Sequence, residues 1–204
     1  MKKLIPLYTI IGLLIATAAC DLIDNNQDES RQFVTSEAFR SELKTALSTY
    51  LHLSEALAKE NEEDARAYAG QLAEAISAID ATGLDGEAAD YWDEHAGNMH
   101  HHGKAIHGQN GLRGQREAFA QLSDAMIDVV HAMGPMDETL YHRSCHMFND
   151  DETGWLSHHE EINHNPYQGE HMNGHHDGRH HNGHNSGHYG DHMSECVRTV
   201  KVIE

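Results

Sequence analysis

Positively charged residues are scarce in this sequence. It has 14 Lys and Arg residues against 33 Asp and Glu residues, so its formal net charge is −19 with histidine neutral. Nucleic-acid binding needs Lys and Arg side chains that displace counterions from phosphates, so this balance argues against a nucleic-acid partner. The negative surface would instead attract cations, although much of the charge is typical of solvated helix faces.

Signatures of catalysis and of nucleotide binding are also missing. The sequence has no Gly-rich phosphate loop and no dinucleotide-binding fingerprint. Cys145 is followed by His146, but neighbouring residues rarely present their side chains to one another, so the pair does not indicate a nucleophile with its base. We therefore expect a protein that is not an enzyme.

The long apolar run of the chain lies at its N-terminus and is short for a membrane span. Two lysines precede the run from Leu4 to Ala19, which has the length of the apolar part of a signal peptide. The small residues Thr17-Ala18-Ala19 stand directly before Cys20, which resembles the lipobox of bacterial lipoproteins. We expect a signal peptide over residues 1–19, lipidation of Cys20, and export to the cell envelope, on the periplasmic side or at the outer membrane. The alternative is an ordinary secretory signal.

Helical periodicity dominates the middle of the chain. Residues 20–35 are polar and acidic and are expected to form a tether. From Ser36, apolar residues recur every three to four positions in four successive segments, the last of which ends at Gly134-Pro135. Asn61, followed by three acidic residues, is typical of a helix N-terminus. These patterns predict an all-α fold, an antiparallel four-helix bundle within a domain over residues 36–170.

The helical period fades after Pro135. The stretches Thr139–Cys145 and Val197–Ile203 could each be a short extended segment, and a pair of strands is one interpretation. The fold prediction instead treats this part as an irregular C-terminal metal-binding segment. A disordered His-rich insertion over residues 171–192 interrupts it, and residues 193–204 complete the domain.

One predicted helix, about Glu87 to Gly108, carries metal-ligating residue types on its apolar face. His95, Met99 and His102 follow one another at steps of three or four residues. They could form a metal site between helices, as the cores of bundles sometimes do. The alternative is that the histidines occupy partly polar core positions and the methionine packs as an ordinary apolar side chain.

Thiol, thioether and imidazole side chains gather between Tyr141 and Cys196. Soft thiolate and thioether ligands favour Cu(I), whereas imidazole suits Cu(II), Zn and Ni. The candidate ligands outside the His-rich insertion, and at its methionines, are Cys145, His146, Met147, Met172, Met193 and Cys196. This composition indicates a metal-handling protein, with copper as the preferred metal.

The insertion over residues 171–192 holds eight histidines among Gly, Asn and Asp residues. Having almost no apolar residues, it cannot form a core and is expected to be flexible. Clustered neutral imidazoles bind Cu(II), Zn or Ni with modest selectivity, so we interpret the insertion as a metal-capturing segment rather than a hydrophilic linker. Its histidines are His171, His175, His176, His180, His181, His184, His188 and His192.

Several motifs of the chain are similar to those of a known family. They include Gln115–Phe119, Tyr141–Met147, Trp155-Leu156-Ser157, Asn165-Pro166-Tyr167 and Gly169–Met172. With them the chain resembles the all-helical domain of unknown function 3347, which occurs alone or at the end of heavy-metal efflux adaptors. The resemblance covers most of the chain from Ser36 on. It implies a copper-associated periplasmic role, with the adaptor of a heavy-metal efflux pump as a partner.

The resemblance also implies a ligand set. Cys145 and Met147 match the Cys-x-Met of the family, and its later Met and Cys correspond to Met172 and Cys196 or to Met193 and Cys196. This chain departs from the pattern at His146, where the family has proline, and at the His-rich insertion. Such a cluster suits Cu(I), whereas the alternative is a structural Cys145–Cys196 disulfide, which an oxidising compartment would permit.

We therefore expect an exported copper-binding lipoprotein that buffers Cu(I) and Cu(II) or delivers copper to an efflux system. Two alternatives are a zinc or nickel sink in which only the His-rich insertion matters, and a structural docking partner of an efflux adaptor. His158 and His159, beside Glu160, could bind metal or could simply be exposed.

Overall fold

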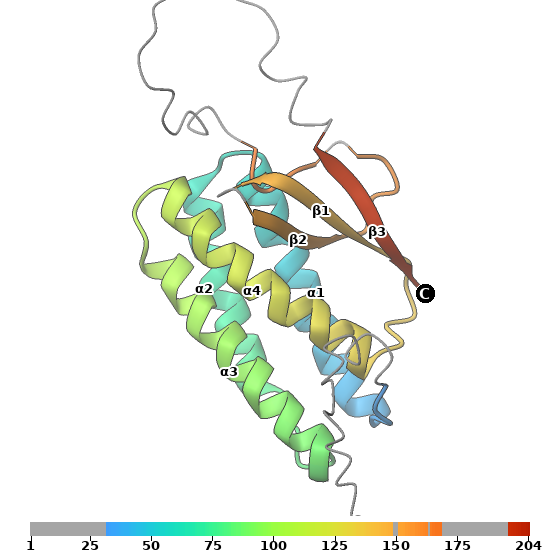
Figure 1. Cartoon of the computed structure of the whole chain (residues 1–204). Coiled ribbons are helices and arrows are strands. Elements are labelled where there is room, and N and C mark those ends of the chain that lie inside the picture. Colours follow the sequence, from blue (N-terminus) through green and yellow to red (C-terminus); the bar gives the residue numbers. More distant parts are fainter. Residues whose placement is uncertain (1–31, 149–150, 163, 169–195) are drawn as a thin grey trace, which may run out of the picture.

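A computed structural model describes residues 32–148, 151–162, 164–168 and 196–204, and every structural statement below concerns these residues (Figure 1). The expected signal peptide, Cys20, most of the tether and the His-rich insertion lie outside them. The predictions about those segments stay predictions.

Four helices pack against one another where the sequence predicts helices. They are α1 (Glu37–Ala58), α2 (Glu62–Ala78), α3 (Gly86–Gly108) and α4 (Leu112–Met133). Side chains cap the N-termini of α1 and α2, and the cap at Asn61 is the one that the sequence predicts. The Ser36 hydroxyl accepts a hydrogen bond from the Phe39 amide at 3.1 Å, and the Asn61 side chain accepts one from the Asp64 amide at 3.1 Å.

The apolar stripes of the four helices form one core. Burial of each large side chain stabilises the fold by about 1.5–3 kcal/mol relative to an exposed position. The buried residues that the periodicity picks out include Phe39, Leu43, Leu47, Leu57, Leu72, Ile76, Trp92, Met99, Ile106, Phe119, Leu122, Met126 and Met133. Chain segments next to the helices close this core, since the Phe33 amide donates to the Ala132 carbonyl at 2.7 Å.

The fold is not all-α, and this part of the prediction is wrong. Three strands, β1 (Leu140–Phe148), β2 (Asp151–Ser157) and β3 (Val197–Ile203), form a sheet of order β2-β1-β3 in which both pairs are antiparallel. The two extended stretches noted in the sequence are β1 and β3, and they pair with each other. The sequence does not reveal β2, because its residues 153–157 are all buried and so lack the alternation of a half-exposed strand.

The sheet lies beside the helices at one end of the molecule, with β2 against α4 and α1 and β3 farthest from them (Figure 1). Gly154 lets β2 approach α4 closely, because a Cβ atom there would lie 2.9 Å from Ile127 Cδ1 and 3.0 Å from His142 Nε2. A larger residue would require the ends of the Ile127 and His142 side chains to move.

The Tyr50 hydroxyl connects the helices to the sheet. It lies 2.8 Å from the Ser123 hydroxyl on α4 and accepts a hydrogen bond from the Leu156 amide on β2 at 3.1 Å. Burial raises the pKa of Tyr50 well above its ordinary value, so the hydroxyl stays neutral. Through this one side chain α1, α4 and β2 hold a fixed relative position. Among the described residues, no helix combines the length and the apolar character needed to cross a membrane.

Candidate metal centre

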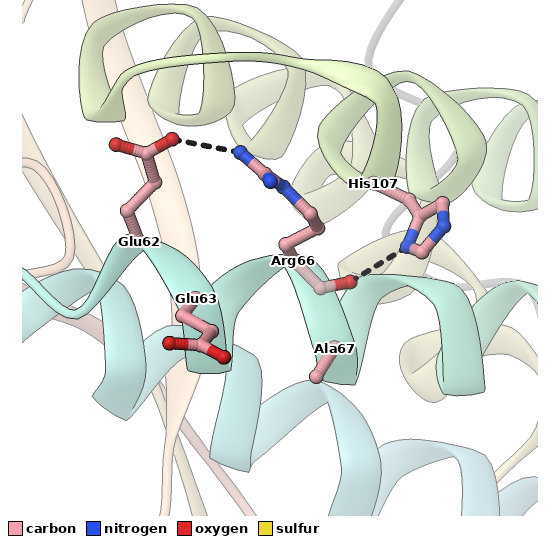
Figure 2. Close-up of a pocket in the computed structure, with 5 residues that line it drawn as sticks. All are labelled: Glu62, Glu63, Arg66, Ala67 and His107. Atoms are coloured by element: carbon pink, nitrogen blue, oxygen red, sulfur yellow. Dashed lines mark hydrogen bonds and ion pairs between the residues drawn. The ribbon is translucent and has the colours of Figure 1, made fainter.

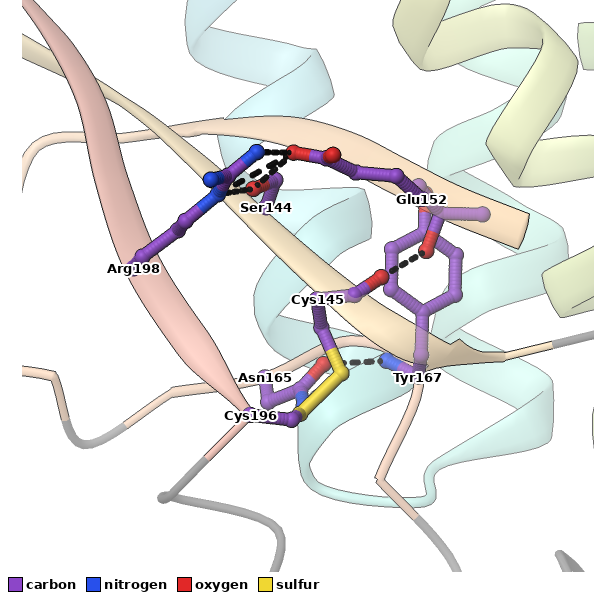
Figure 3. Close-up of a disulfide and its surroundings, with 8 residues drawn as sticks. Ser144, Cys145, Glu152, Asn165, Tyr167, Cys196 and Arg198 are labelled. Carbon is purple, nitrogen blue, oxygen red and sulfur yellow. Dashed lines mark hydrogen bonds and ion pairs between the residues drawn. A yellow bond between two sulfur atoms is a disulfide. The ribbon is translucent and has the colours of Figure 1, made fainter. Parts of the chain in front are cut away.

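Cys145 and Cys196 are joined by a disulfide, the alternative that the sequence left open (Figure 3). Cys145 lies in β1 opposite Val197 of β3, and Cys196 directly precedes Val197, so the pairing of the two strands brings the cysteines together. Their Cα atoms are 5.0 Å apart, and both residues are buried. In this state neither sulfur is a thiolate, so neither is a Cu(I) ligand of the predicted kind.

Of the other members of the predicted Cu(I) set, the structure describes the side chain of His146 alone. His146 is exposed on β1. Met147 belongs to β1, but its side chain is outside what the structure describes, as are Met172, Met193 and the eight histidines of the insertion. The Cys/Met copper site therefore stays a prediction for the reduced protein.

A tight turn at Asn165-Pro166-Tyr167 lies beside the disulfide (Figure 3). The Asn165 side chain accepts a hydrogen bond from the Tyr167 amide at 3.0 Å and places its amide nitrogen 3.8 Å from the Cys196 sulfur. The Tyr167 ring is fully buried and its hydroxyl donates to the Gly154 carbonyl at 3.0 Å. The turn that precedes the His-rich insertion and the cysteine that follows it are thus in contact with each other.

Arg116 of α4 fixes the same turn from the helix side. Its buried guanidinium donates to the carbonyls of Pro166 at 2.8 Å and Leu57 at 3.1 Å, and also to the Gln168 carbonyl. Two motifs that the family resemblance singled out, around Arg116 and around Pro166, are therefore in direct contact.

The proposed ligands on α3 lie as the alternative interpretation expects. Met99 is fully buried among apolar side chains. Both ring nitrogens of His95 face partners, Nδ1 the Tyr91 carbonyl at 2.8 Å and Nε2 the Asp128 carboxylate at 3.4 Å. Desolvation lowers and the Asp128 carboxylate raises the pKa of His95, and the net direction is upward. Groups of the protein thus contact both ring nitrogens of His95, and the metal site on α3 stays a prediction.

Three other side chains gather where a metal ion could bind. Glu55 of α1 and His158 and His159, which follow β2, each offer one ligand atom, and these atoms lie within 4.8 Å of one another. His158 Nε2 is 3.8 Å and His159 Nε2 is 3.6 Å from Glu55 Oε1. The sequence offered Glu160 as the neighbouring acid, whereas the fold supplies Glu55, which no local pattern could connect with these histidines.

A shallow hollow between α2 and α3 is a weaker candidate (Figure 2). Two interactions occupy polar groups of this hollow. Within α2, Arg66 donates a hydrogen bond to Glu62 at 2.8 Å, and the His107 ring of α3 lies 3.0 Å from the Arg66 carbonyl. These contacts hold the two helices together and leave no set of ligands that converge on a common point.

Comparison with known proteins gives one family. Residues 46–138 match the model of a family described as "Protein of unknown function (DUF3347)". The match covers the helices from the middle of α1 onward and ends just before β1. No curated protein and no solved structure matches the chain.

Proposed function

We propose that the protein is exported and lipid-anchored, and that it binds copper and holds it for an efflux system. Through its residues 46–138 the chain belongs to the family of unknown function 3347. The role is one of binding rather than catalysis. The helices and the sheet serve as a rigid body that carries the metal-binding groups.

The observation that carries this proposal is the way the His-rich insertion is attached. The turn at Asn165 and the disulfide at Cys196 flank residues 169–195 and contact each other. Two fixed ends restrict the space that the chain between them can explore, which raises the concentration of imidazoles close to the folded body. Eight histidines in such a closed segment form a metal-capturing region of high capacity.

The donor types determine which oxidation state of copper would bind. Imidazole suits Cu(II), and the insertion can supply it whatever the state of the cysteines. Cu(I) binding by Cys145 and Cys196 requires reduction of the disulfide, because only the thiolates are soft ligands of this metal. The proposal therefore has Cu(II) bound in the oxidised protein and Cu(I) in the reduced protein. The remaining surface is the region for docking to an efflux adaptor.

A zinc or nickel sink is a second candidate, favoured by the disulfide itself. With both cysteine sulfurs bonded, the thiolates are lost as ligands, and the imidazole and carboxylate groups that remain do not exclude zinc or nickel. Retention of Zn(II) or Ni(II) by the oxidised protein in the presence of equimolar Cu(II) would favour this second candidate, because Cu(II) binds most nitrogen and oxygen sites more tightly than either ion.

The experiment that tests the proposal is a titration of the oxidised and the reduced protein with copper in competition with a chromophoric chelator. The matched variant has all eight histidines of residues 171–192 replaced by Asn, which preserves the length of the segment. We expect most Cu(II) equivalents to disappear in this variant, while the reduced protein keeps one Cu(I) equivalent. An unchanged Cu(II) stoichiometry would show that the insertion does not bind metal. Full Cu(I) binding by a reduced Cys145→Ser/Cys196→Ser variant would exclude the thiolates as ligands.

A further inference from the structure

We propose that Glu55, His158 and His159 form a defined binding site for a borderline divalent transition-metal cation, Zn(II) or Cu(II), on the folded body of the protein. The inference deepens the metal-binding function proposed above and rests on it. It differs in locating a site of fixed geometry outside the His-rich insertion and outside the disulfide.

The distances fit a metal ion with little rearrangement. Bonds of about 2.1 Å from zinc to nitrogen or oxygen put two ligands of a tetrahedral ion about 3.4 Å apart. The separations from Glu55 Oε1 to the Nε2 atoms of His158 and His159 are 3.8 and 3.6 Å. Movements of a few tenths of an ångström would therefore bring each imidazole nitrogen to this distance from Glu55 Oε1, and all three ligand atoms already lie within 4.8 Å of one another.

The carboxylate is already divided between two tasks. Lys59 donates to Glu55 Oε2 at 2.9 Å, whereas both imidazoles face Oε1. Lys59 therefore orients the carboxylate from the side away from the histidines. Hydrogen bonds of this kind commonly orient carboxylates that bind metal ions.

One imidazole nitrogen is buried and lacks a hydrogen bond. His159 Nε2 is shielded from solvent and has no hydrogen-bond partner among the described residues, although it lies 3.6 Å from Glu55 Oε1. A polar atom that is buried without a hydrogen bond destabilises the folded state. A metal ion between this nitrogen and the carboxylate would remove this destabilisation and supply the missing partner.

The backbone that carries the histidines is held by buried groups. Arg143 of β1 donates to the carbonyls of His159 at 2.8 Å and Glu160 at 2.6 Å, and the Ser157 hydroxyl accepts from the His159 amide at 3.1 Å. The His164 ring stacks on His159, with centroids 4.7 Å apart. The ligands thus project from a fixed support, which lowers the entropic cost of gathering them.

The donor set selects the class of cation. Two imidazoles and one carboxylate suit Zn(II) and Cu(II), whereas Mg(II) and Ca(II) prefer oxygen ligands throughout. No sulfur takes part, so Cu(I) is disfavoured. The side chains of His158 and His159 are 41% and 34% exposed, so water can fill a fourth position and the cation can enter directly from solvent.

A site-resolved titration of the whole chain tests the assignment. Cu(II) is added below one equivalent to the oxidised, ¹⁵N-labelled protein, and the broadening of backbone amide signals is followed. We expect the signals of Glu55 and residues 157–159 to broaden first, and Zn(II) to shift the same signals. If Cu(II) broadens the insertion alone, this site is wrong and the proposed function stands. If neither metal binds at all, both fail.

Two pairs of variants then identify the ligands, with the Ser157 amide as the reporter of Zn(II) binding. His158→Ala/His159→Ala should raise the Zn(II) concentration at half-maximal shift by at least about 100-fold. Loss of the groups that merely hydrogen-bond to metal ligands already lowers metal affinity by about 10–100-fold. The control His100→Ala/His101→Ala removes two neighbouring histidines of α3 and should change it less than twofold. Glu55→Gln should also weaken binding, against Glu63→Gln as control. Equal effects of test and control variants would overturn the proposal, provided circular dichroism shows all of them folded.

Discussion

Removal of the Cys145–Cys196 disulfide should destabilise the protein by a calculable amount. The two cysteines are 51 residues apart, and the loop-entropy relation gives about 4 kcal/mol at 25 °C for a loop of this length. Because cross-links often contribute less than this relation predicts, we expect a loss of about 2–4 kcal/mol in the double variant Cys145→Ala/Cys196→Ala. This is a large part of the roughly 5–15 kcal/mol of net stability that a domain has.

Urea denaturation followed by far-UV circular dichroism measures this loss. The variant should unfold at a lower urea concentration and with a larger slope, since an unfolded chain without the cross-link exposes more surface. The wild type treated with a reductant should behave like the variant. The control Ser144→Ala changes a residue next to the disulfide that is hydrogen-bonded to Glu152, and it should lower the free energy of unfolding by no more than about 1–2 kcal/mol. A variant that unfolds at the wild-type midpoint with the same slope would refute the reasoning, as would a wild type that does not respond to the reductant.

Three further predictions concern the contacts around this end of the molecule. Tyr50→Phe removes the acceptor of the Leu156 amide and the partner of Ser123, so the free energy of unfolding measured with urea should fall by about 1–3 kcal/mol. The control Tyr68→Phe, at a half-buried tyrosine of α2, should lower it by less than about 0.5 kcal/mol. Equal losses would contradict the role assigned to Tyr50. Arg116→Met removes the guanidinium that donates to the carbonyls of Leu57, Pro166 and Gln168. It should lower the free energy of unfolding by roughly 3 kcal/mol and shift the NMR signals of residues 165–168, whereas Arg113→Met, at an exposed position of the same helix, should leave those signals in place. Desolvation and, to a smaller extent, the charge of Asp128 raise the pKa of Asp124 to about 6. Because the pKa of an aspartate in the unfolded chain is about 3.9, protonated Asp124 stabilises the folded state below that pH, and this stabilisation is lost as the pH rises through about 6. Asp124→Asn should therefore raise the urea midpoint at pH 7 relative to the wild type and not at pH 4, and an equal change at both pH values would contradict the assignment.

The helical part of the fold could be predicted from the sequence because its determinants are local. The apolar residues at helical spacing, the cap at Asn61 and the stop at Gly134-Pro135 each act within a few residues of the helix that they define. The structure confirms each of these features. The sheet was harder to predict because β1 pairs with β3 across more than 50 residues and because β2 is buried on both sides and lacks alternation.

The candidate sites divide in the same way. The sequence indicates that Cys145 and Cys196 meet, since both a shared metal and a disulfide require it, but the spacing does not determine which of the two forms. That choice depends on the redox environment. The partnership of Glu55 with His158 and His159 joins residues about a hundred positions apart, so it follows from the packing of β2 on α1 and not from any motif. The contact of Arg116 with the Asn165–Gln168 turn is equally non-local.

The measurement that tests the central proposal most directly is the copper content of the purified protein at equilibrium. The oxidised whole chain is dialysed against micromolar Cu(II) in the presence of a weak competing ligand such as glycine, and bound copper is measured per chain by atomic absorption. The account predicts more than one retained equivalent, with about one left when the eight histidines of residues 171–192 are replaced by Asn. Retention of no copper by the wild-type protein would contradict the proposal that it binds this metal.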